Sequence, residues 1–105
     1  MEAAVIRLGY LSLNMRIRME FVEPDLHERF PTGAWFGHCD VFRWTAGVAR
    51  EYQAAARVLR RVYGPLHIFI QSDNNKLKRF AALGGFKHFF DERRGADAWE
   101  VWRRS

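Results

Sequence analysis

Two side chains that could exchange a proton with a ligand lie two positions apart in the segment AWFGHCDVFR, residues 34–43. Side chains of a strand alternate between the two faces of a sheet, so His38 and Asp40 would share one face. An imidazole placed there can act as a general base, and a carboxylate beside it can share that role. The plainer interpretation, which we favour, is that Asp40 forms a turn or an ion pair and His38 is only half-exposed.

Other residues with reactive side chains are expected to be structural. Cys39 is the one cysteine of the chain, and we expect a small buried core residue rather than a reactive thiol. Glu20 falls on the polar side of an alternating segment and is expected to be solvated. His27, His67 and His88 have no metal-ligand spacing with Cys39 or with one another, so the sequence predicts no metal site.

The composition favours one basic, globular domain spanning residues 1–105. Hydrophobic residues make up 49% of the 105 residues, which is enough apolar surface to form a core. The net charge of +5 and the pI near 10.0 attract phosphate groups. Nucleic-acid binding is nevertheless disfavoured, because none of the known reader motifs occurs.

Nothing in the sequence indicates secretion or membrane insertion. A single cysteine cannot form an internal disulfide, and the first residues do not resemble a signal peptide. No apolar run approaches the roughly 20 residues needed to cross a bilayer. We therefore expect a cytoplasmic protein that does not contact membranes.

The clearest periodicity in the sequence is in LSLNMRIRMEF, residues 11–21. Its alternation predicts a long half-buried strand with six apolar side chains on one face. The six are Leu11, Leu13, Met15, Ile17, Met19 and Phe21. The run at residues 3–8 is its expected hairpin partner, with the bend at Gly9 and Tyr10.

Residues 23–33 contain two prolines and a glycine without periodicity, which predicts a loop. The strand at residues 34–43 follows, and Gly37 in its interior predicts a bulge or a close backbone approach. After it, helical spacing from Val48 to Val62 predicts a long helix with Thr45 as its N-cap and a stop at Gly64.

The remaining segments predict a strand at residues 66–71, a short helix capped by Ser72 or Asp73, and two strands at residues 86–93 and 98–104. This order predicts an α/β (α+β) fold in which a mixed, mostly antiparallel sheet contains a central parallel strand–helix–strand crossover. Trp99 and Trp102 fall on opposite faces of the last strand, so one should be exposed or covered by a partner such as a second copy.

The segment NNKLKRFAALGGF, residues 74–86, resembles a helix of the GCN5-related N-acetyltransferase (GNAT) superfamily. That helix commonly ends in a pattern like N-x-x-A-x-x-F-Y-x-x-x-G-F. The residues in that register are Asn74, Leu77, Phe80, Gly85 and Phe86. The order of strands and helices around this segment is also similar to the later part of the GNAT fold.

A second resemblance is to small acetyltransferase-like proteins of tailed phages. These share a W-F strand followed by a helix that starts V-[FW]-R-x-[ST]-x-x-A-x-R-E-[FY]. The corresponding residues are Trp35, Phe36, Val41, Phe42, Arg43, Thr45 and 48–52. Together the two resemblances cover about the last two thirds of the chain.

The GNAT resemblance implies that acetyl-CoA binds where the strands at residues 34–43 and 66–71 splay apart. Its pantetheine arm would pair with backbone groups, and its pyrophosphate would lie at the start of the long helix. The implied cofactor-binding residues are Phe42, Arg43, Thr45, Ala46, Gly47, Val48, Ala49, Asn74 and Phe80, and the catalytic candidates are His38 and Asp40.

The chain departs from the family pattern at three places. One extra residue separates Arg43 from Gly47, and Ala81 stands where many members carry the tyrosine that protonates the departing thiolate. The usual pair of helices between the first two strands has no room, so the fold would be truncated, with residues 23–33 as a replacement lid.

Two functions therefore remain open. The chain transfers acetyl groups to a small amine or a protein lysine, or it is a non-catalytic phage or prophage protein that keeps the fold for virion assembly or for binding a host partner.

Overall fold

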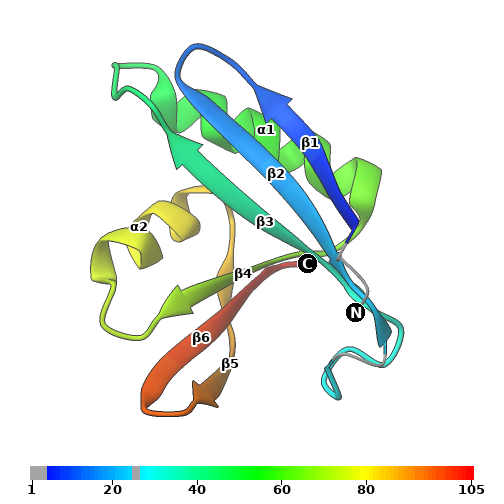
Figure 1. The fold of residues 1–105 in the computed structure, drawn as a ribbon. Coiled ribbons are helices and arrows are strands. Elements are labelled where there is room, and N and C mark those ends of the chain that lie inside the picture. Colours follow the sequence, from blue (N-terminus) through cyan, green and yellow to red (C-terminus); the bar gives the residue numbers. More distant parts are fainter. Residues whose placement is uncertain (1–4, 25–26) are drawn as a thin grey trace.

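The computed structural model describes residues 5–24 and 27–105, which form one six-stranded sheet and two helices (Figure 1). The elements are β1 (Val5–Leu11), β2 (Met15–Val22), β3 (Ala34–Val41), α1 (Val48–Tyr63), β4 (Leu66–Gln71), α2 (Asn75–Leu83), β5 (Lys87–Arg94) and β6 (Asp97–Arg104). Residues 3 and 4 of the first predicted strand lie outside the described ranges. Within those ranges, no helix has the length and apolar character needed to cross a bilayer.

The strand order is β1-β2-β3-β4-β6-β5, and every neighbouring pair is antiparallel except β3 and β4. This confirms the predicted mixed sheet with one parallel crossover through α1. The parallel contact is short, because only Trp35 pairs with Leu66 and Phe36 with His67. Beyond these two pairs the strands diverge, and the sheet opens into a V (Figure 1).

One face of the sheet packs against both helices. Its core joins buried residues of β2, α1, β4 and α2. The buried members are Met15, Ile17, Met19, Val48, Tyr52, Ala55, Leu59, Leu66, Ile70, Ala81 and Phe86. The two helices thus fix both arms of the V from the same side.

The opposite face has a smaller core at the closed end of the V. Phe30, from the loop before β3, packs edge-on against Phe36 with ring centroids 5.4 Å apart. Ala34, Phe90 and Val101 complete this cluster. The loop therefore covers the point where β3 and β4 still pair.

The first hairpin turns later than predicted. Leu11 ends β1, and the turn lies at residues 12–14, where the Ser12 hydroxyl accepts hydrogen bonds from the N–H groups of Asn14 and Met15. Of the six apolar residues expected on one face, Leu11 and Leu13 are exposed, and Met15, Ile17 and Met19 are buried. A serine that bonds two backbone N–H groups defines this turn better than the glycine does.

Of the two alternatives predicted for Gly37, the bulge is wrong, because β2 and β3 pair without a register shift. The first hairpin instead has its irregularity at Gly9, where an added Cβ would lie 2.9 Å from Met19 Cγ. A second irregularity lies between His88 and Phe90 of the last hairpin.

Both predicted helix caps are displaced by two residues or less. Gly47, not Thr45, is the N-cap of α1, and no side chain caps it. Asn74, rather than Ser72 or Asp73, caps α2 by accepting a hydrogen bond from the Leu77 N–H at 3.0 Å. The stop at Gly64 is confirmed, and its φ of 81° suits glycine.

Neither tryptophan of β6 is exposed. Trp99 and Trp102 are both half-buried, and Trp102 donates a hydrogen bond to Glu100 at 2.9 Å. The expectation that one of them is exposed is therefore wrong, and cover by a partner stays a prediction.

Adjacent positions of α1 provide a test of this packing. Leu59 is 5% exposed and Val58 is 54% exposed. Leu59→Ala should lower the free energy of unfolding by about 2–5 kcal/mol, because it leaves a cavity between α1 and β2. Val58→Ala, the control, should change it by no more than about 0.5 kcal/mol. Urea denaturation measures both, and equal effects would contradict the observed face of α1.

Candidate functional site

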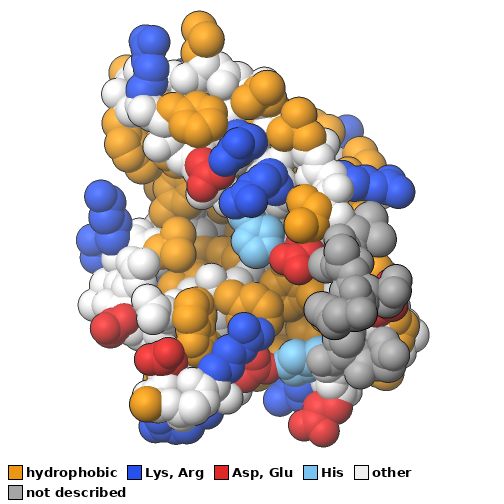
Figure 2. All heavy atoms as spheres, in the orientation of Figure 1, with side chains coloured by type: hydrophobic (Ala, Val, Ile, Leu, Met, Phe, Trp, Pro, Cys, Tyr) orange, Lys and Arg blue, Asp and Glu red, His pale blue; other side chains and the backbone are white. Residues whose placement is uncertain are grey.

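A cleft of about 270 Å³ occupies the opening between β3 and β4. Most of its lining is apolar and comes from β2, β4, α1 and α2. Figure 2 shows this hollow lined with hydrophobic side chains, with charged and histidine side chains at its rim. The lining residues are Ile17, Arg18, Met19, Gly37, His38, Cys39, Asp40, Tyr52, Ala56, Leu59, Leu66, Ile68, Phe69, Leu77, Phe80 and Phe86.

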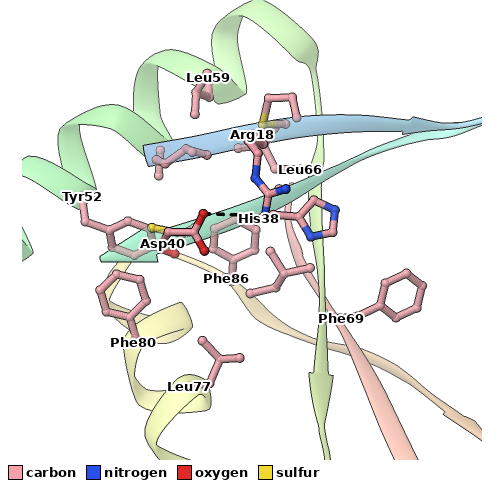
Figure 3. A pocket seen from close by; sticks show the side chains of 16 residues that line it. Arg18, His38, Asp40, Tyr52, Leu59, Leu66, Phe69, Leu77, Phe80 and Phe86 are labelled. Carbon is pink, nitrogen blue, oxygen red and sulfur yellow. Dashed lines mark ion pairs between the residues drawn. The ribbon is translucent and has the colours of Figure 1, made fainter. Parts of the chain in front are cut away.

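Asp40 lies at the rim of the cleft in an ion-pair cluster, as the plainer interpretation expected. Its Oδ2 lies 2.7 Å from Arg16 Nη2 and 3.6 Å from Arg18 Nη2, and Figure 3 marks the Arg18 pair. The hydrogen bond from Arg16 lowers the pKa of the Asp40 carboxyl, with the charges of Arg16 and Arg18 acting in the same direction. The carboxylate is therefore ionised and engaged, which makes it a poor proton acceptor at neutral pH.

His38 lies two residues away on the same face and has a different partner. Its Nε2 is 2.8 Å from Oε1 of Glu20, which sits diagonally across on β2. A carboxylate only accepts hydrogen bonds at neutral pH, so Nε2 donates and Nδ1 remains the basic nitrogen. Glu20, expected to be merely solvated, orients this imidazole.

Cys39 is exposed at the mouth of the cleft, so the expectation of a buried core residue is wrong. Its sulfur still lies against apolar neighbours. Burial, followed by the nearby Asp40 charge, raises the pKa of the thiol to about 11. The thiol is protonated at neutral pH and is not an activated nucleophile.

Tyr52 lines the cleft from α1 and is also part of the core. Its ring stacks on Phe80 of α2 with centroids 4.0 Å apart, and the two lie side by side in Figure 3. Burial raises the pKa of the phenol, which therefore stays protonated. Helical spacing alone cannot distinguish a core tyrosine from one whose ring also borders a cavity.

The segment between β3 and α1 is held by the first hairpin. The N–H groups of Phe42 and Arg43 both donate to the Asn14 carbonyl, at 2.7 and 3.4 Å. Glu51, in the first turn of α1, bonds the side chains of Tyr10 and Asn14. The backbone N–H groups of two predicted cofactor-binding residues are therefore already occupied.

The start of α1 itself remains open. No atom lies within 4 Å of the position that a Gly47 Cβ would occupy. Within the described chain, no partner accepts from the N–H groups of Ala49 and Arg50. Free N–H groups and the helix dipole favour an anion at this end of the helix.

The other predicted cofactor-binding residues are divided between surface and core. Thr45 and Ala46 are exposed beside Gly47, whereas the Val48 side chain is fully buried and its N–H donates to the Thr45 carbonyl. Asn74 caps α2 and borders a shallow pocket next to the cleft, and Phe80 lines both cavities.

A separate polar cluster lies on the last hairpin. His88, Asp91 and Glu100 place one ligand atom each within 4.8 Å of one another, which the spacing of the histidines did not indicate. The register shift after His88 places the His88 side chain on the same face of the hairpin as that of Asp91. His88 Nε2 lies 2.8 Å from Asp91 Oδ1. Lys78 Nζ lies 2.6 Å from Glu100 and already supplies a cation to this cluster.

No protein-family model and no curated protein sequence matches the chain, but its fold is similar to that of solved structures. It superposes on a candidate GNAT-family acetyltransferase from Bordetella pertussis with a TM-score of 0.66 and 18% identity, covering 88% of this chain and 57% of that one. A candidate acetyltransferase from Sphaerobacter thermophilus gives a TM-score of 0.45 and 17% identity, covering 88% and 60%. The chain thus has a GNAT-like fold and spans little more than half of each of these proteins.

The Asp40 ion pair gives a testable titration. Arg16→Gln should raise the pKa of the Asp40 carboxyl toward its ordinary value, because the strongest stabiliser of the carboxylate is lost. Carbon-13 NMR of the carboxyl group measures the midpoint. Arg50→Gln, which removes an exposed arginine of α1, is the matched control and should leave the midpoint in place. An unchanged midpoint in Arg16→Gln would show that this ion pair does not persist in solution.

Proposed function

We propose that this chain binds acetyl-CoA in the cleft between β3 and β4 and transfers the acetyl group to an amine. The observation that carries this proposal is the divergence of two parallel strands over an apolar cleft, with an open helix N-terminus at the end of β3. The GNAT-like fold of the chain supports it.

The cleft suits a slender chain that carries amide groups. Beyond Phe36 and His67, the facing edges of β3 and β4 do not pair with each other. Unpaired N–H and C=O groups at such an edge can bind a ligand amide as they would bind another strand. The apolar lining from Met19, Leu59 and Phe86 would pack against the rest of the chain.

The start of α1 suits the phosphate groups of acetyl-CoA. Gly47 leaves room for close approach, and the N–H groups of Ala49 and Arg50 are available there. Arg43 lies exposed nearby and adds positive charge. The acidic Glu51 side chain would oppose an anion, but it is bonded to Tyr10 and Asn14.

Acetyl-CoA would supply an acetyl group activated as a thioester. In the chain, His38 would accept the proton of the acceptor amine at Nδ1 while Glu20 holds Nε2. Tyr52 carries a protonated phenol, lines the cleft and would donate to the departing sulfur. It would take the role that Ala81 cannot fill.

A second candidate is a non-catalytic protein that keeps this fold for virion assembly or for binding a host partner. Two observations favour it: Ala81 replaces the usual proton donor, and the N–H groups of Phe42 and Arg43 are bonded to Asn14. This candidate requires no acetyl-CoA binding, so a binding measurement separates the two.

Gly37 offers a way to close the cleft without disturbing the fold. A Cβ at this position would meet Met19 Sδ and Ile68 Cγ2 only at ordinary contact distances, 3.8 and 3.9 Å. Gly37→Val should therefore fold and place two methyl groups in the cleft. It should weaken acetyl-CoA binding about tenfold or more, equivalent to ~1.4 kcal/mol, in isothermal titration calorimetry.

Gln53→Val, on the exposed side of α1, is the control for the added side chain and should bind like the parent chain. Equal affinity of Gly37→Val and the parent chain would place the ligand elsewhere. Absence of binding by the parent chain at hundred-micromolar acetyl-CoA would overturn the acetyltransferase proposal and favour the non-catalytic one.

The proposed proton transfers predict the behaviour of two variants. With a panel of small amines and lysine peptides, release of free thiol from acetyl-CoA should slow by about 10²–10⁴ in His38→Gln, because the base is lost. Tyr52→Phe should reduce kcat while retaining acetyl-CoA affinity, because the ring stacking on Phe80 is kept.

His88→Gln, which alters an exposed histidine of β5 outside the cleft, is the control and should match the parent rate. Full activity of His38→Gln would exclude this histidine as the base.

A further inference from the structure

A second cavity, of about 420 Å³, lies at the closed end of the V and shares no lining residue with the cleft. The loop before β3, the end of α1 and the first residues of β4 surround it. Its lining residues are Phe21, Arg29, Phe30, Pro31, Thr32, Gly33, Ala34, Trp35, Tyr63, Pro65, His67, Phe89 and Arg103. No acidic residue is among these described lining residues.

His67 is the most buried polar residue of this cavity, at 4% exposure. Its Nδ1 lies 3.2 Å from the backbone carbonyl of Trp35. A carbonyl oxygen only accepts hydrogen bonds, so Nδ1 must carry the proton. The rings of Phe30 and Phe36 pack against the imidazole, with centroids 4.8 and 5.3 Å away.

The environment keeps this imidazole neutral. Burial lowers the pKa of His67 to about 4, and the charge of Arg103 acts in the same direction. With Nδ1 protonated and the ring neutral, Nε2 has a free lone pair. Within residues 5–24 and 27–105 no group donates to Nε2, and this atom is not among the buried atoms without partners, so it is open to the cavity.

Arg103 brings a positive charge to the same cavity. It pairs directly with His67 across β4 and β6, so both side chains project from one face. Its guanidinium lies over the Phe89 ring, 4.9 Å from the centroid. Within residues 5–24 and 27–105, no carboxylate forms an ion pair with this guanidinium.

We propose that this cavity binds a small aromatic acid whose carboxylate pairs with Arg103 and whose ring N–H or O–H donates to Nε2 of His67. Three features of the cavity match the three parts of such a molecule. Aromatic walls take the ring, a guanidinium without an ion-pair partner in the described chain takes the carboxylate, and an unprotonated imidazole nitrogen takes the donor. Arg29, exposed at the cavity, adds a second positive charge that attracts the anion.

The site is independent of acetyl transfer, because the two cavities have no residue in common. Its ligand differs from an acetyl acceptor in charge, since an amine would meet two arginines and no carboxylate among the described lining residues. The positive charge of the two arginines therefore attracts acids, and repels amines, before the ligand touches the cavity.

Indole-2-carboxylate is a suitable probe, because its ring N–H and carboxylate lie on one edge. We expect calorimetry with the full chain to show binding, and Arg103→Gln to weaken it about tenfold or more because a charge-assisted pair is lost. Benzoate, which lacks the N–H, should bind several-fold more weakly. Arg61→Gln, an exposed arginine of α1, is the matched control and should bind like the parent chain.

A measurement on the parent chain avoids reliance on a variant at a buried position. Nitrogen-15 NMR should show His67 protonated at Nδ1 and unprotonated at Nε2, and addition of the probe should shift the Nε2 signal. A proton on Nε2 in the free chain would overturn the proposal. So would an unshifted Nε2 signal, absence of binding at millimolar probe, or equal losses in Arg103→Gln and Arg61→Gln.

Discussion

The divergence of β3 and β4 is the constraint on which the rest of the structure depends. Parallel neighbours in a sheet normally pair along their length, but here pairing stops after Phe36 and His67. An open seam in a sheet would collapse or fill with water unless something held its sides apart. Tyr52 and Leu59 of α1 on one arm, and Phe80 of α2 on the other, pack across the same face and support both arms. The cleft is thus a consequence of helix packing.

The register between β2 and β3 decides the chemistry at the rim of that cleft. Arg16 lies opposite Asp40 and Arg18 opposite His38, so the two arginines engage the carboxylate and Glu20 engages the imidazole. A slip of one strand by one residue would turn its side chains to the other face and separate them from these partners. The contact with Glu20 involves Nε2 of His38 and, within the described residues, leaves Nδ1 without a partner, whereas Asp40 is held by two arginines.

Local patterns in the sequence were enough to predict the element types and the single parallel crossover. Alternation placed Met15 and Ile17 in the core, and the His38–Asp40 spacing placed both on one face. The predictions that failed concern features that depend on contacts between residues far apart in the sequence. Gly9, not Gly37, is crowded by neighbours from elsewhere in the chain, and the partners of His38 come from a strand whose register no local pattern contains. The cavity around His67 draws on five separate segments and left no local signal.

The position of Tyr52 depends on how two helices share space. A Cβ on Gly84 would lie 2.6 Å from the Tyr52 ring, so α2 must be small there for Tyr52 to fit. Ala81 is also small and fully buried in the same core. A bulky residue at either position would compete with Tyr52 for volume. The Tyr52 ring therefore fits between α1 and α2 because α2 carries small residues there, and the aromatic stack on Phe80 keeps the ring in place. The aromatic ring that borders the cleft thus comes from α1, and the small residues of α2 decide how it lies.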